Sequence, residues 1–314
     1  MDCEDRETLR TRIGALRAET AALEARLASL DRVDSSTRAR DGALDDDRGE
    51  SASRPMPLAD YRRYGRQMIL KPVGLPGQLA LRRARVLAVG AGGLGCPALL
   101  YLATAGVGRI GIVDHDTVEL SNLHRQVLHT ESSVGLPKAE SARRALRECV
   151  IALLRRSPSR RNATIDITAH VCAFDELVVD GYDLVLDCTD NASTRHRINA
   201  ACVDRGITLV SGAAIRTDGQ LSVWNLALAD GARGPCYACV FPPSSAVDES
   251  SQRCEDEGVL GPVTGAIGTL MACEAIRLLT GSHGASDLAA HLTAQIARPS
   301  SRCSTRSTIR LSAR

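Results

Sequence analysis

The spacing of hydrophobic residues divides the chain near residue 57. Before this point, apolar residues recur at alternating intervals of four and three from Leu9 to Leu30, interrupted only by Thr20. This heptad pattern predicts a helix over residues 1–33, which could pair as a short coiled coil or pack as a lone amphipathic helix. Residues 34–56 are polar, lack periodicity and contain Gly, Ser and Pro, which predicts a disordered linker.

From Pro57 onward, short aliphatic runs alternate with helical stretches. The runs predict strands within residues 84–90, 109–114, 163–171, 182–190 and 207–212. The stretches between them predict helices within residues 92–106, 137–156 and 191–206. This alternation predicts an α/β fold with a doubly wound, Rossmann-like, mainly parallel sheet and an antiparallel extension over residues 57–285. Residues 286–314 are rich in Ser, Thr and Arg, which predicts a divergent, disordered tail.

Composition narrows the class of protein. Hydrophobic content of 44% and charged content of 24% are typical of a globular protein. No continuous apolar run approaches the roughly 18 residues of a membrane span, and the first residues lack a signal peptide, so we expect a cytoplasmic protein without a membrane partner. Eleven cysteines, an odd number at scattered spacings, favour reduced thiols. A net charge of +2 predicts no direct binding of nucleic acid.

A glycine motif follows the first predicted strand. Gly90, Gly92 and Gly95 in "VGAGGLG" fit G-x-G-x-x-G between a strand and a helix, where backbone N–H groups and the helix dipole favour a phosphate. Asp114 ends the second strand, 19 residues beyond Gly95, where a carboxylate can accept hydrogen bonds from a ribose. The motif alone indicates an adenine nucleotide and leaves a nicotinamide oxidoreductase open.

Two cations and two carboxylates lie beyond the predicted strands. Arg125 in "SNLHRQ" and Lys138 in "VGLPKAESA" suit a triphosphate better than a nicotinamide, although each could instead be a solvated surface cation. Asp187 and Asp190 close the fourth strand in "DLVLDCTDN". A carboxylate at the carboxyl end of a strand, facing phosphates, is a natural ligand of Mg²⁺. Asp187 still belongs to the strand pattern and favours a structural role, so Asp190 is the better candidate.

Seven of the eleven cysteines fall into three groups. Cys236 and Cys239 form the C-x-x-C of "GPCYACVF", a spacing that fits half of a zinc site, a redox dithiol or two buried thiols. Cys254 lies in a polar segment, where exposure favours reactivity although the three acidic residues that follow it would raise its pKa. Four others fall on helix or strand patterns and are expected to be small core residues: Cys96, Cys188, Cys202 and Cys273.

Taken together, these segments resemble the MoeB/ThiF adenylyltransferases. The resemblance runs in unbroken order over roughly residues 58–284 and includes "RYGRQMIL", the glycine motif through "SNLHRQ", "VGLPKAESA", "DLVLDCTDN", "LVSGAAIRTDGQLSVW" and "GPCYACVFP". It is strongest to eukaryotic members that combine adenylyltransferase and sulfurtransferase functions. The resemblance implies a homodimeric enzyme of ubiquitin-activating type. Such an enzyme binds ATP and Mg²⁺ and adenylates the C-terminal glycine of a ubiquitin-like sulfur carrier ending in Gly-Gly. Its product leads to a carrier thiocarboxylate for tRNA thiolation or molybdopterin synthesis.

The resemblance also assigns roles to residues. Arg66 of "RYGRQ" corresponds to an arginine that reaches the phosphates from the partner subunit, and Cys254 to a cysteine that attacks the acyl-adenylate or receives sulfur. Cys236 and Cys239 would be one half of a four-cysteine zinc site. Within the G-x-G-x-x-G motif and beyond it, the ATP site falls on Gly90, Gly92, Gly95, Asp114, Ser121, Asn122, Leu123, His124, Arg125, Lys138, Asp190 and Asn191.

The sequence departs from the family pattern in two places. It contains no second C-x-x-C, and two thiolates alone leave zinc under-coordinated, so zinc binding stays open. It also shows no sulfurtransferase domain after the adenylation domain, which implies that the sulfur donor acts in trans. An alternative function is therefore a shortened, catalytically impaired form that dimerises or binds the carrier. Without a final strand, the edge of the sheet would be exposed.

Overall fold

The structure is a computed structural model that describes residues 54–154, 165–228, 231–243, 258–281 and 308–311. The chain divides into two units, residues 1–57 and 58–314, and the fold described below is that of the second unit. The predicted heptad helix and nearly all of the predicted linker lie outside the described residues.

A seven-stranded sheet forms the centre of this unit, in the order β3-β2-β1-β4-β5-β6-β7. The first five strands in sequence pair in parallel, whereas β6 is antiparallel to β5 and β7 is antiparallel to β6. The prediction of a doubly wound, mainly parallel sheet with an antiparallel extension is confirmed. The strands are β1 (Arg85–Val89), β2 (Arg109–Val113), β3 (Asp166–His170), β4 (Leu184–Asp187), β5 (Thr208–Ile215), β6 (Asp218–Trp224) and β7 (Thr308–Leu311).

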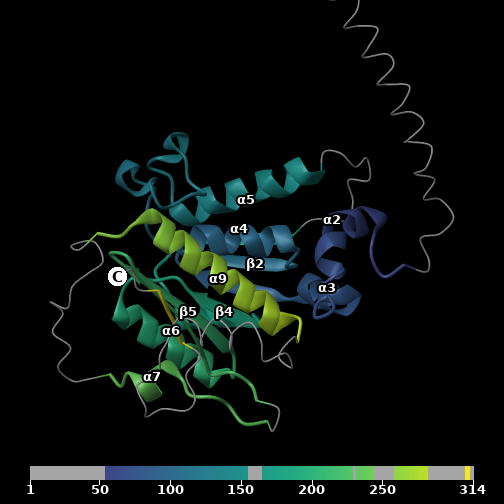
Figure 1. Ribbon diagram of the computed structural model, residues 1–314. Coiled ribbons are helices and arrows are strands. Elements are labelled where there is room, and N and C mark those ends of the chain that lie inside the picture. The colour runs from purple at the N-terminus through teal and green to yellow at the C-terminus, as the bar shows by residue number, and fades with distance from the viewer. Residues whose placement is uncertain (1–53, 155–164, 229–230, 244–257, 282–307, 312–314) are drawn as a thin grey trace, which may run out of the picture. The chain divides into compact units, whose positions relative to one another are not determined.

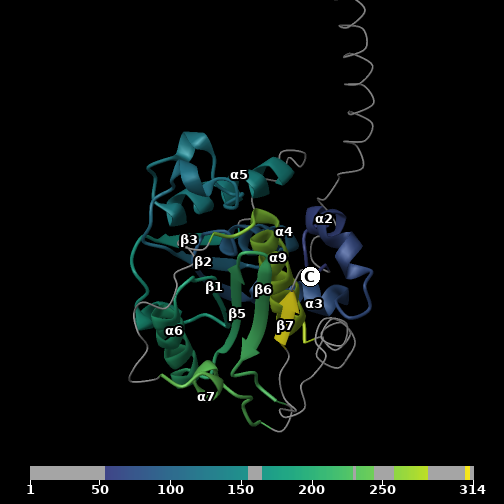
Figure 2. The ribbon, with the colours of Figure 1, turned by 60° about the vertical axis from the view of Figure 1, so that its left-hand side comes forward.

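Strand β7 lies in the segment that the sequence predicted to be a disordered tail. Its four residues pair with β6, with Thr308 opposite Ser222 and Leu311 opposite Gly219. For residues 308–311, the prediction is therefore wrong. An edge strand such as β6 presents a row of unpaired backbone groups, and a segment as short as four residues can satisfy them through its main chain. The edge of β6 that the sequence analysis expected to be exposed is covered along these four residues (Figure 2).

Helices cover both faces of the sheet (Figures 1 and 2). On one face, α4 and α9 pack closely together, with α5 beside α4 and over β3. On the other face, α6 packs on β4 and β5, with η3 and α7 beside it. The helices are α2 (Leu58–Met68), α3 (Gly74–Arg83), α4 (Gly95–Ala105), η1 (Leu120–Asn122), η2 (Glu131–Ser133), α5 (Lys138–Leu154), η3 (Glu176–Val179), α6 (Ala192–Asp204), α7 (Tyr237–Val240) and α9 (Gly261–Leu279).

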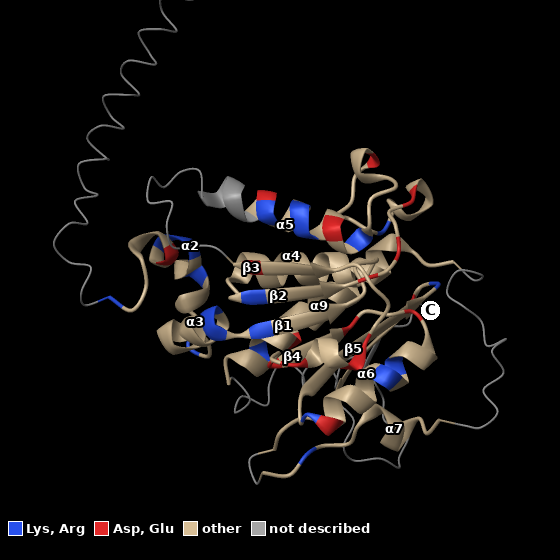
Figure 3. Cartoon of the chain, turned by 180° about the vertical axis from the view of Figure 1, so that it is seen from behind, with Lys and Arg blue, Asp and Glu red and all other residues tan. Residues whose placement is uncertain are grey.

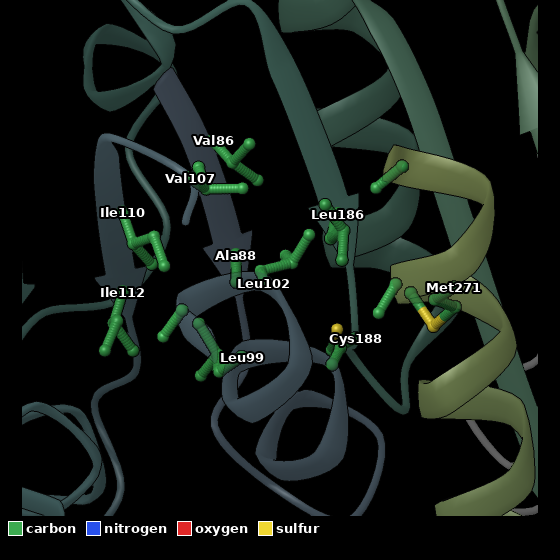
Figure 4. Packing of buried hydrophobic residues seen from close by; sticks show 14 of the residues in the cluster. Val86, Ala88, Leu99, Leu102, Val107, Ile110, Ile112, Leu186, Cys188 and Met271 are labelled. Atoms are coloured by element: carbon green, nitrogen blue, oxygen red, sulfur yellow. The ribbon is translucent and has the colours of Figure 1, made fainter. Parts of the chain in front are cut away.

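Alternate residues of the central strands enter two hydrophobic clusters. In β1, Val86 and Ala88 belong to the cluster beneath α4 and α9, whereas Leu87 and Val89 belong to the cluster beneath α6. Figure 4 shows the first cluster, which includes Val86 and Ala88 of β1 together with Leu99 and Leu102 of α4. Because both faces of these strands are buried, their sequences are continuously apolar rather than alternating.

Charged residues at the amino ends of the parallel strands form ion pairs between neighbouring strands. Arg85 at the start of β1 pairs with Asp183 at 2.8 Å, and Arg109 at the start of β2 pairs with Asp166 at 3.5 Å. Figure 3 shows these arginines as blue segments at the beginnings of β1 and β2. Such surface pairs contribute only about 0–1 kcal/mol each. The opposite, carboxyl ends of the strands are the ends at which doubly wound folds bind ligands.

Helix α9 corrects two expectations. By length and composition, its 19 residues are apolar enough to cross a membrane, so the expectation that no segment approaches this limit is wrong. Its inner face is buried against α4 and β5, with Ile267, Met271 and Ala275 fully covered, which is the packing of a core helix. Cys273 lies on the outer face and is exposed, whereas Cys96, Cys188 and Cys202 are buried as expected.

Candidate active site

A glycine loop joins β1 to α4 at the centre of the sheet. Val89 at the end of β1 pairs in register with Val113 of β2 and Asp187 of β4. The chain runs outward from β1 to β3 on one side and then returns to β4 on the other side. The loop from Gly90 therefore opens at the point where the strand order reverses, which is the usual ligand site of such sheets.

The three glycines of the loop have different surroundings. Gly90 has a φ of 100°, a left-handed conformation that L side chains rarely adopt. A Cβ on Gly95, the first residue of α4, would lie 2.0 Å from the Gly90 carbonyl oxygen. At Gly92, by contrast, the nearest atom to a Cβ would be Gln126 Nε2 at 3.6 Å. The backbone at Gly92 is thus open to the close approach of a ligand, as the phosphate motif predicts.

Asp114 fixes the shape of this loop. Its Oδ2 accepts a hydrogen bond from the Ala91 N–H at 2.7 Å, and its Oδ1 accepts one from the Asp116 N–H at 2.9 Å. The residue is 9% exposed. A carboxylate oxygen carries two lone pairs, so the two amides leave acceptor capacity for the ribose that the sequence analysis assigned to Asp114.

Lys138 is the first residue of α5 and carries a buried ammonium group. Its Nζ donates to Asp116 Oδ2 at 2.8 Å, which fixes the ammonium beside the loop after β2. Burial raises the pKa of Asp116, but the hydrogen bond and charge of Lys138, with a smaller effect of His115, lower it by more, so the net pKa is below its usual range. Lys138 is therefore a fixed cation rather than a solvated one.

The segment that carries the other predicted ATP ligands is a short turn containing η1. Arg125 Nη2 donates to Asn122 Oδ1 at 2.8 Å, and the His124 ring Nδ1 lies 2.9 Å from the Ser121 carbonyl, to which it must donate. Leu123 is half-buried in the same turn. A Cβ on Gly261, at the start of α9, would lie 2.6 Å from the His124 carbonyl oxygen, so α9 packs directly on this segment.

Two buried residues of the site were not assigned a role from the sequence. Gln126 is 3% exposed, its amide nitrogen faces Gly92, and its Oε1 has no partner in the part of the chain that the structure describes. His129 Nε2 lies 2.9 Å from the Ala91 carbonyl, and its Nδ1 lies 2.9 Å from Ser141 Oγ on α5. Because a carbonyl can only accept, the neutral tautomer carries its proton on Nε2, and His129 joins the glycine loop to α5.

The neutral state of His129 predicts a dependence of stability on pH. Burial lowers its pKa below the ordinary 6.5, the hydrogen bond to Ala91 opposes this shift, and the charge of Lys138 adds to it. Below pH 6.5 the unfolded state therefore binds the proton more readily, and stability that is present above this pH is lost as the pH falls toward the folded pKa. We expect the His129→Gln variant, which can keep both hydrogen bonds, to lose less stability on acidification than the wild type.

Urea unfolding between about pH 7.5 and pH 5.5 measures the difference between the two proteins in stability lost on acidification, which for one histidine cannot exceed about 1.4 kcal/mol at one pH unit below 6.5. His115→Gln is the matched control, because the His115 side chain is 69% exposed. Equal acid sensitivity of the wild type and His129→Gln would show that His129 does not titrate on unfolding in this range.

The loop between β4 and α6 separates the two acidic candidates. Asp187 is fully buried and accepts hydrogen bonds on both oxygens, from Thr189, Ser211 and Arg195. Asp190 is exposed, and its carboxylate has no hydrogen bond or ion pair with any residue that the structure describes. Asn191 Oδ1 caps α6 by accepting a hydrogen bond from the Thr194 N–H at 2.8 Å. The side-chain NH₂ of Asn191 is therefore the group left to bind a ligand.

Arg66 lies apart from this group within one chain. Its helix, α2, is tied to the last residue of α4, because Gln67 Nε2 donates to the Ala105 carbonyl at 2.8 Å. The glycine loop is at the opposite end of α4, whose 11 residues span about 16 Å. Arg66 itself is exposed and lines an open hollow on α2 together with Tyr61 and Ile69.

Cys236 and Cys239 have the geometry of half a metal site. Their Sγ atoms lie 3.4 Å apart, close to the about 3.8 Å between two thiolates on a tetrahedral zinc. Partial burial raises the pKa of Cys236, but hydrogen bonds from Asn199, Cys239 and nearby amides lower it by more, which favours the thiolate. Among the described residues, no third His, Cys, Asp or Glu joins the pair, so they supply two of four ligands. Cys254 lies outside the described residues.

The fold and the glycine loop agree with the comparison to known families. Residues 64–312 match the ThiF family, to which this chain therefore belongs. The chain is 46% identical over 293 residues to "Adenylyltransferase and sulfurtransferase uba4" of Aspergillus fumigatus and 45% identical over 283 residues to "Adenylyltransferase and sulfurtransferase MOCS3" of Drosophila grimshawi. These matches cover 87% and 88% of this chain but only 57% and 58% of the relatives.

Solved structures share the fold at lower identity. The PaaA crystal structure has a TM-score of 0.57 and 19% identity, over 74% of this chain and 69% of PaaA. The structure of E. coli MccB with ATP has a TM-score of 0.54 and 22% identity, over 72% of this chain and 66% of MccB. At these identities, the likeness establishes the fold alone.

Proposed function

We propose that this chain catalyses ATP-dependent adenylation of the C-terminal glycine of a ubiquitin-like sulfur carrier that ends in Gly-Gly. Membership of the ThiF family and the names of its relatives support the reaction class. The observation that carries the proposal is the grouping of an open glycine loop, a fixed Lys138 ammonium and an unpaired Asp190 carboxylate at the carboxyl ends of β1, β2 and β4, among the residues that the structure describes.

The reaction joins the carrier carboxylate to the α-phosphorus of ATP and breaks the bond between the α- and β-phosphates. Pyrophosphate leaves, and a mixed anhydride of the carrier with AMP remains. The attacking carboxylate and the phosphates are both anionic, so fixed cations must offset their repulsion. Lys138 and Arg125 supply positive charge from one chain. Arg66, which is exposed at the far end of α4, supplies it from a second subunit, and this role requires a homodimer.

Asp190 is the carboxylate that fits Mg²⁺. This ion binds proteins through one or two carboxylates together with substrate phosphates, and it supplies charge that neutralises the phosphates and the leaving group. An exposed carboxylate without a partner in the described part of the chain suits this role, whereas Asp187 has both oxygens occupied. Zinc is different, because Cys236 and Cys239 supply only two ligands among the described residues, and no step is assigned to it.

The later steps rest on residues outside the described ranges. We propose that the Cys254 thiolate attacks the acyl-adenylate, forming a thioester and releasing AMP. A donor acting in trans then supplies sulfur at the level of hydrosulfide, which displaces the Cys254 thiolate and leaves the carrier thiocarboxylate, in the cytoplasm, for tRNA thiolation or molybdopterin synthesis. An alternative is a form that binds the carrier or dimerises without catalysis. The nicotinamide oxidoreductase left open by the glycine motif finds no support in the names of the relatives.

ATP–pyrophosphate exchange tests the proposal. Purified protein should incorporate labelled pyrophosphate into ATP only when a carrier ending in Gly-Gly is present, and a carrier lacking its last glycine should not support exchange. Asp190→Asn should lower the rate about 100-fold or more, by analogy with the loss of one preorganised electrostatic group. Asp204→Asn, at the exposed opposite end of α6, is the matched control. Carrier binding without any exchange would favour the non-catalytic alternative.

A further inference from the structure

One buried ion pair lies directly before the loop that carries Asp190. Arg195 Nε on α6 donates to Asp187 Oδ2 at 2.6 Å, and the two side chains are 14% and 0% exposed. The same Oδ2 accepts from Ser211 Oγ on β5 at 2.7 Å. Oδ1 accepts from the backbone N–H and the hydroxyl of Thr189, at 3.0 and 2.6 Å. Asp187 is thus fully engaged by the protein.

The Arg195 guanidinium reaches beyond Asp187. Its Nη2 donates to the Thr189 carbonyl and to the Gly212 carbonyl, both at 2.9 Å. The guanidinium carbon lies 5.9 Å from the centre of the Tyr237 ring, which supports its orientation. One planar group therefore ties β4, β5 and the loop after β4 together. A lysine ammonium at this position could pair with Asp187 but lacks the fork that spans several fixed acceptors.

The loop uses its other side chains to hold its own conformation. Cys188 is buried, Thr189 is bound to Asp187, and Asn191 caps α6. Asp190 is the one charged side chain among residues 188–191. It is exposed and has no hydrogen bond or ion pair with the described part of the chain. The arrangement anchors the loop on both sides of Asp190 and presents its carboxylate.

We propose that Arg195 is a positioning residue for the adenylation reaction: its clamp on Asp187, Thr189 and Gly212 holds the loop in the conformation in which Asp190 reaches the metal-bound triphosphate. The inference rests on the proposed function, because that function gives Asp190 its role. This positioning role differs from a purely structural role, in which Arg195 would only neutralise the buried charge of Asp187.

The Arg195→Lys variant separates the two roles, because it keeps the charge and removes the fork. If Arg195 positions the loop, the variant should still fold but with a lower melting temperature, because the Thr189 and Gly212 carbonyls lose their donor. Its kcat for exchange should fall about 100-fold, as expected when a reacting group is misplaced by about 1 Å. The Mg²⁺ concentration for half-maximal exchange should rise. In the absence of nucleotide, hydrogen–deuterium exchange should accelerate at residues 188–190 and stay unchanged in β1 and β2.

Arg197→Lys is the matched control. Arg197 lies on the same helix and makes a more exposed fork to two acceptors, donating to Glu176 Oε1 and to the Phe174 carbonyl, both at 2.8 Å. It should leave kcat, the Mg²⁺ dependence and loop exchange unchanged. If Arg195→Lys does not fold, the double variant Asp187→Asn with Arg195→Met removes both buried charges together and is measured in the same way.

Wild-type kcat and Mg²⁺ dependence in a folded Arg195→Lys or double variant would overturn the inference and leave the proposed function standing. The inference would also fail if Arg197→Lys lost as much activity as Arg195→Lys. Absence of carrier-dependent exchange in the wild type would instead remove the proposed function, and the inference with it. Faster loop exchange together with a lower kcat and a raised Mg²⁺ requirement, confined to the Arg195 variants, would support it.

Discussion

Replacing Gly92 with Ala is expected to weaken ATP binding while leaving the fold intact, whereas replacing Gly95 with Ala is expected to damage the fold itself. A Cβ on Gly92 would meet only Gln126 Nε2, at 3.6 Å, an ordinary contact distance. The methyl group would occupy the space through which a phosphate approaches the loop. Overpacking costs about 1–3 kcal/mol, which corresponds to about 5- to 150-fold in the dissociation constant.

The Gly95→Ala variant is expected to lose stability, because its new Cβ would lie 2.0 Å from the Gly90 carbonyl oxygen. This oxygen belongs to the backbone, so it cannot move away without a change in the loop conformation. We expect a loss of about 3 kcal/mol or more in the free energy of unfolding. Gly265→Ala on α9 is the matched control: no atom of the described residues lies within 4 Å of its Cβ, so the substitution should stabilise the protein by up to about 1 kcal/mol.

Calorimetric titration with ATP and Mg²⁺ measures binding by the Gly92 variant, and urea unfolding measures the stability of all three variants. Unchanged ATP affinity in Gly92→Ala would mean that no phosphate approaches this part of the loop. Unchanged stability in Gly95→Ala would mean that the loop has another low-energy conformation.

The sheet could be predicted from sequence because its central strands are buried on both faces. Leu87 and Ala88 are neighbours that face opposite sides, and both are fully buried, so the strand reads as an uninterrupted apolar run. The last strand could not be predicted. Ile309 and Leu311 alternate with polar residues, but the alternation covers only four positions inside a Ser-, Thr- and Arg-rich segment, which is too short to predict a strand without the free edge of β6.

Candidate site residues could be predicted where a local motif marks them, but not where the contact that suggests a role is distant in sequence. The glycine loop and Asp114 follow from the order of a strand, a turn and a helix. His129 contacts the Ala91 carbonyl from 38 positions away, and Arg195 contacts the Gly212 carbonyl from 17 positions away. The sequence around His129 or Arg195 does not indicate that its side chain will bind a distant backbone carbonyl, because only the tertiary fold brings the side chain and the carbonyl together.

Removing the Lys138 ammonium is expected to have the largest effect on catalysis. In Lys138→Met, the carbon chain remains, but the buried cation beside the loop after β2 is lost. The loss of one preorganised electrostatic group commonly lowers kcat by about 100- to 1,000-fold, so carrier-dependent ATP–pyrophosphate exchange should fall by this factor. The chain has only one other lysine, Lys71, which is exposed, and Lys71→Met is therefore the matched control.

The stability of Lys138→Met should change much less than its activity. The Asp116 side chain is 51% exposed, and a pair with such solvent access contributes about 0–1 kcal/mol. Because the net pKa of Asp116 is lowered, this contribution is present above its unfolded pKa and is lost only as the pH falls through the folded value, so the pair is intact at neutral pH. Urea unfolding at neutral pH therefore measures the full effect. Exchange at the wild-type rate by a folded Lys138→Met variant would show that Lys138 does not stabilise the charge that develops on the phosphates. If the variant lost exchange and stability together, the role of Lys138 would instead be to hold the structure of the loop after β2.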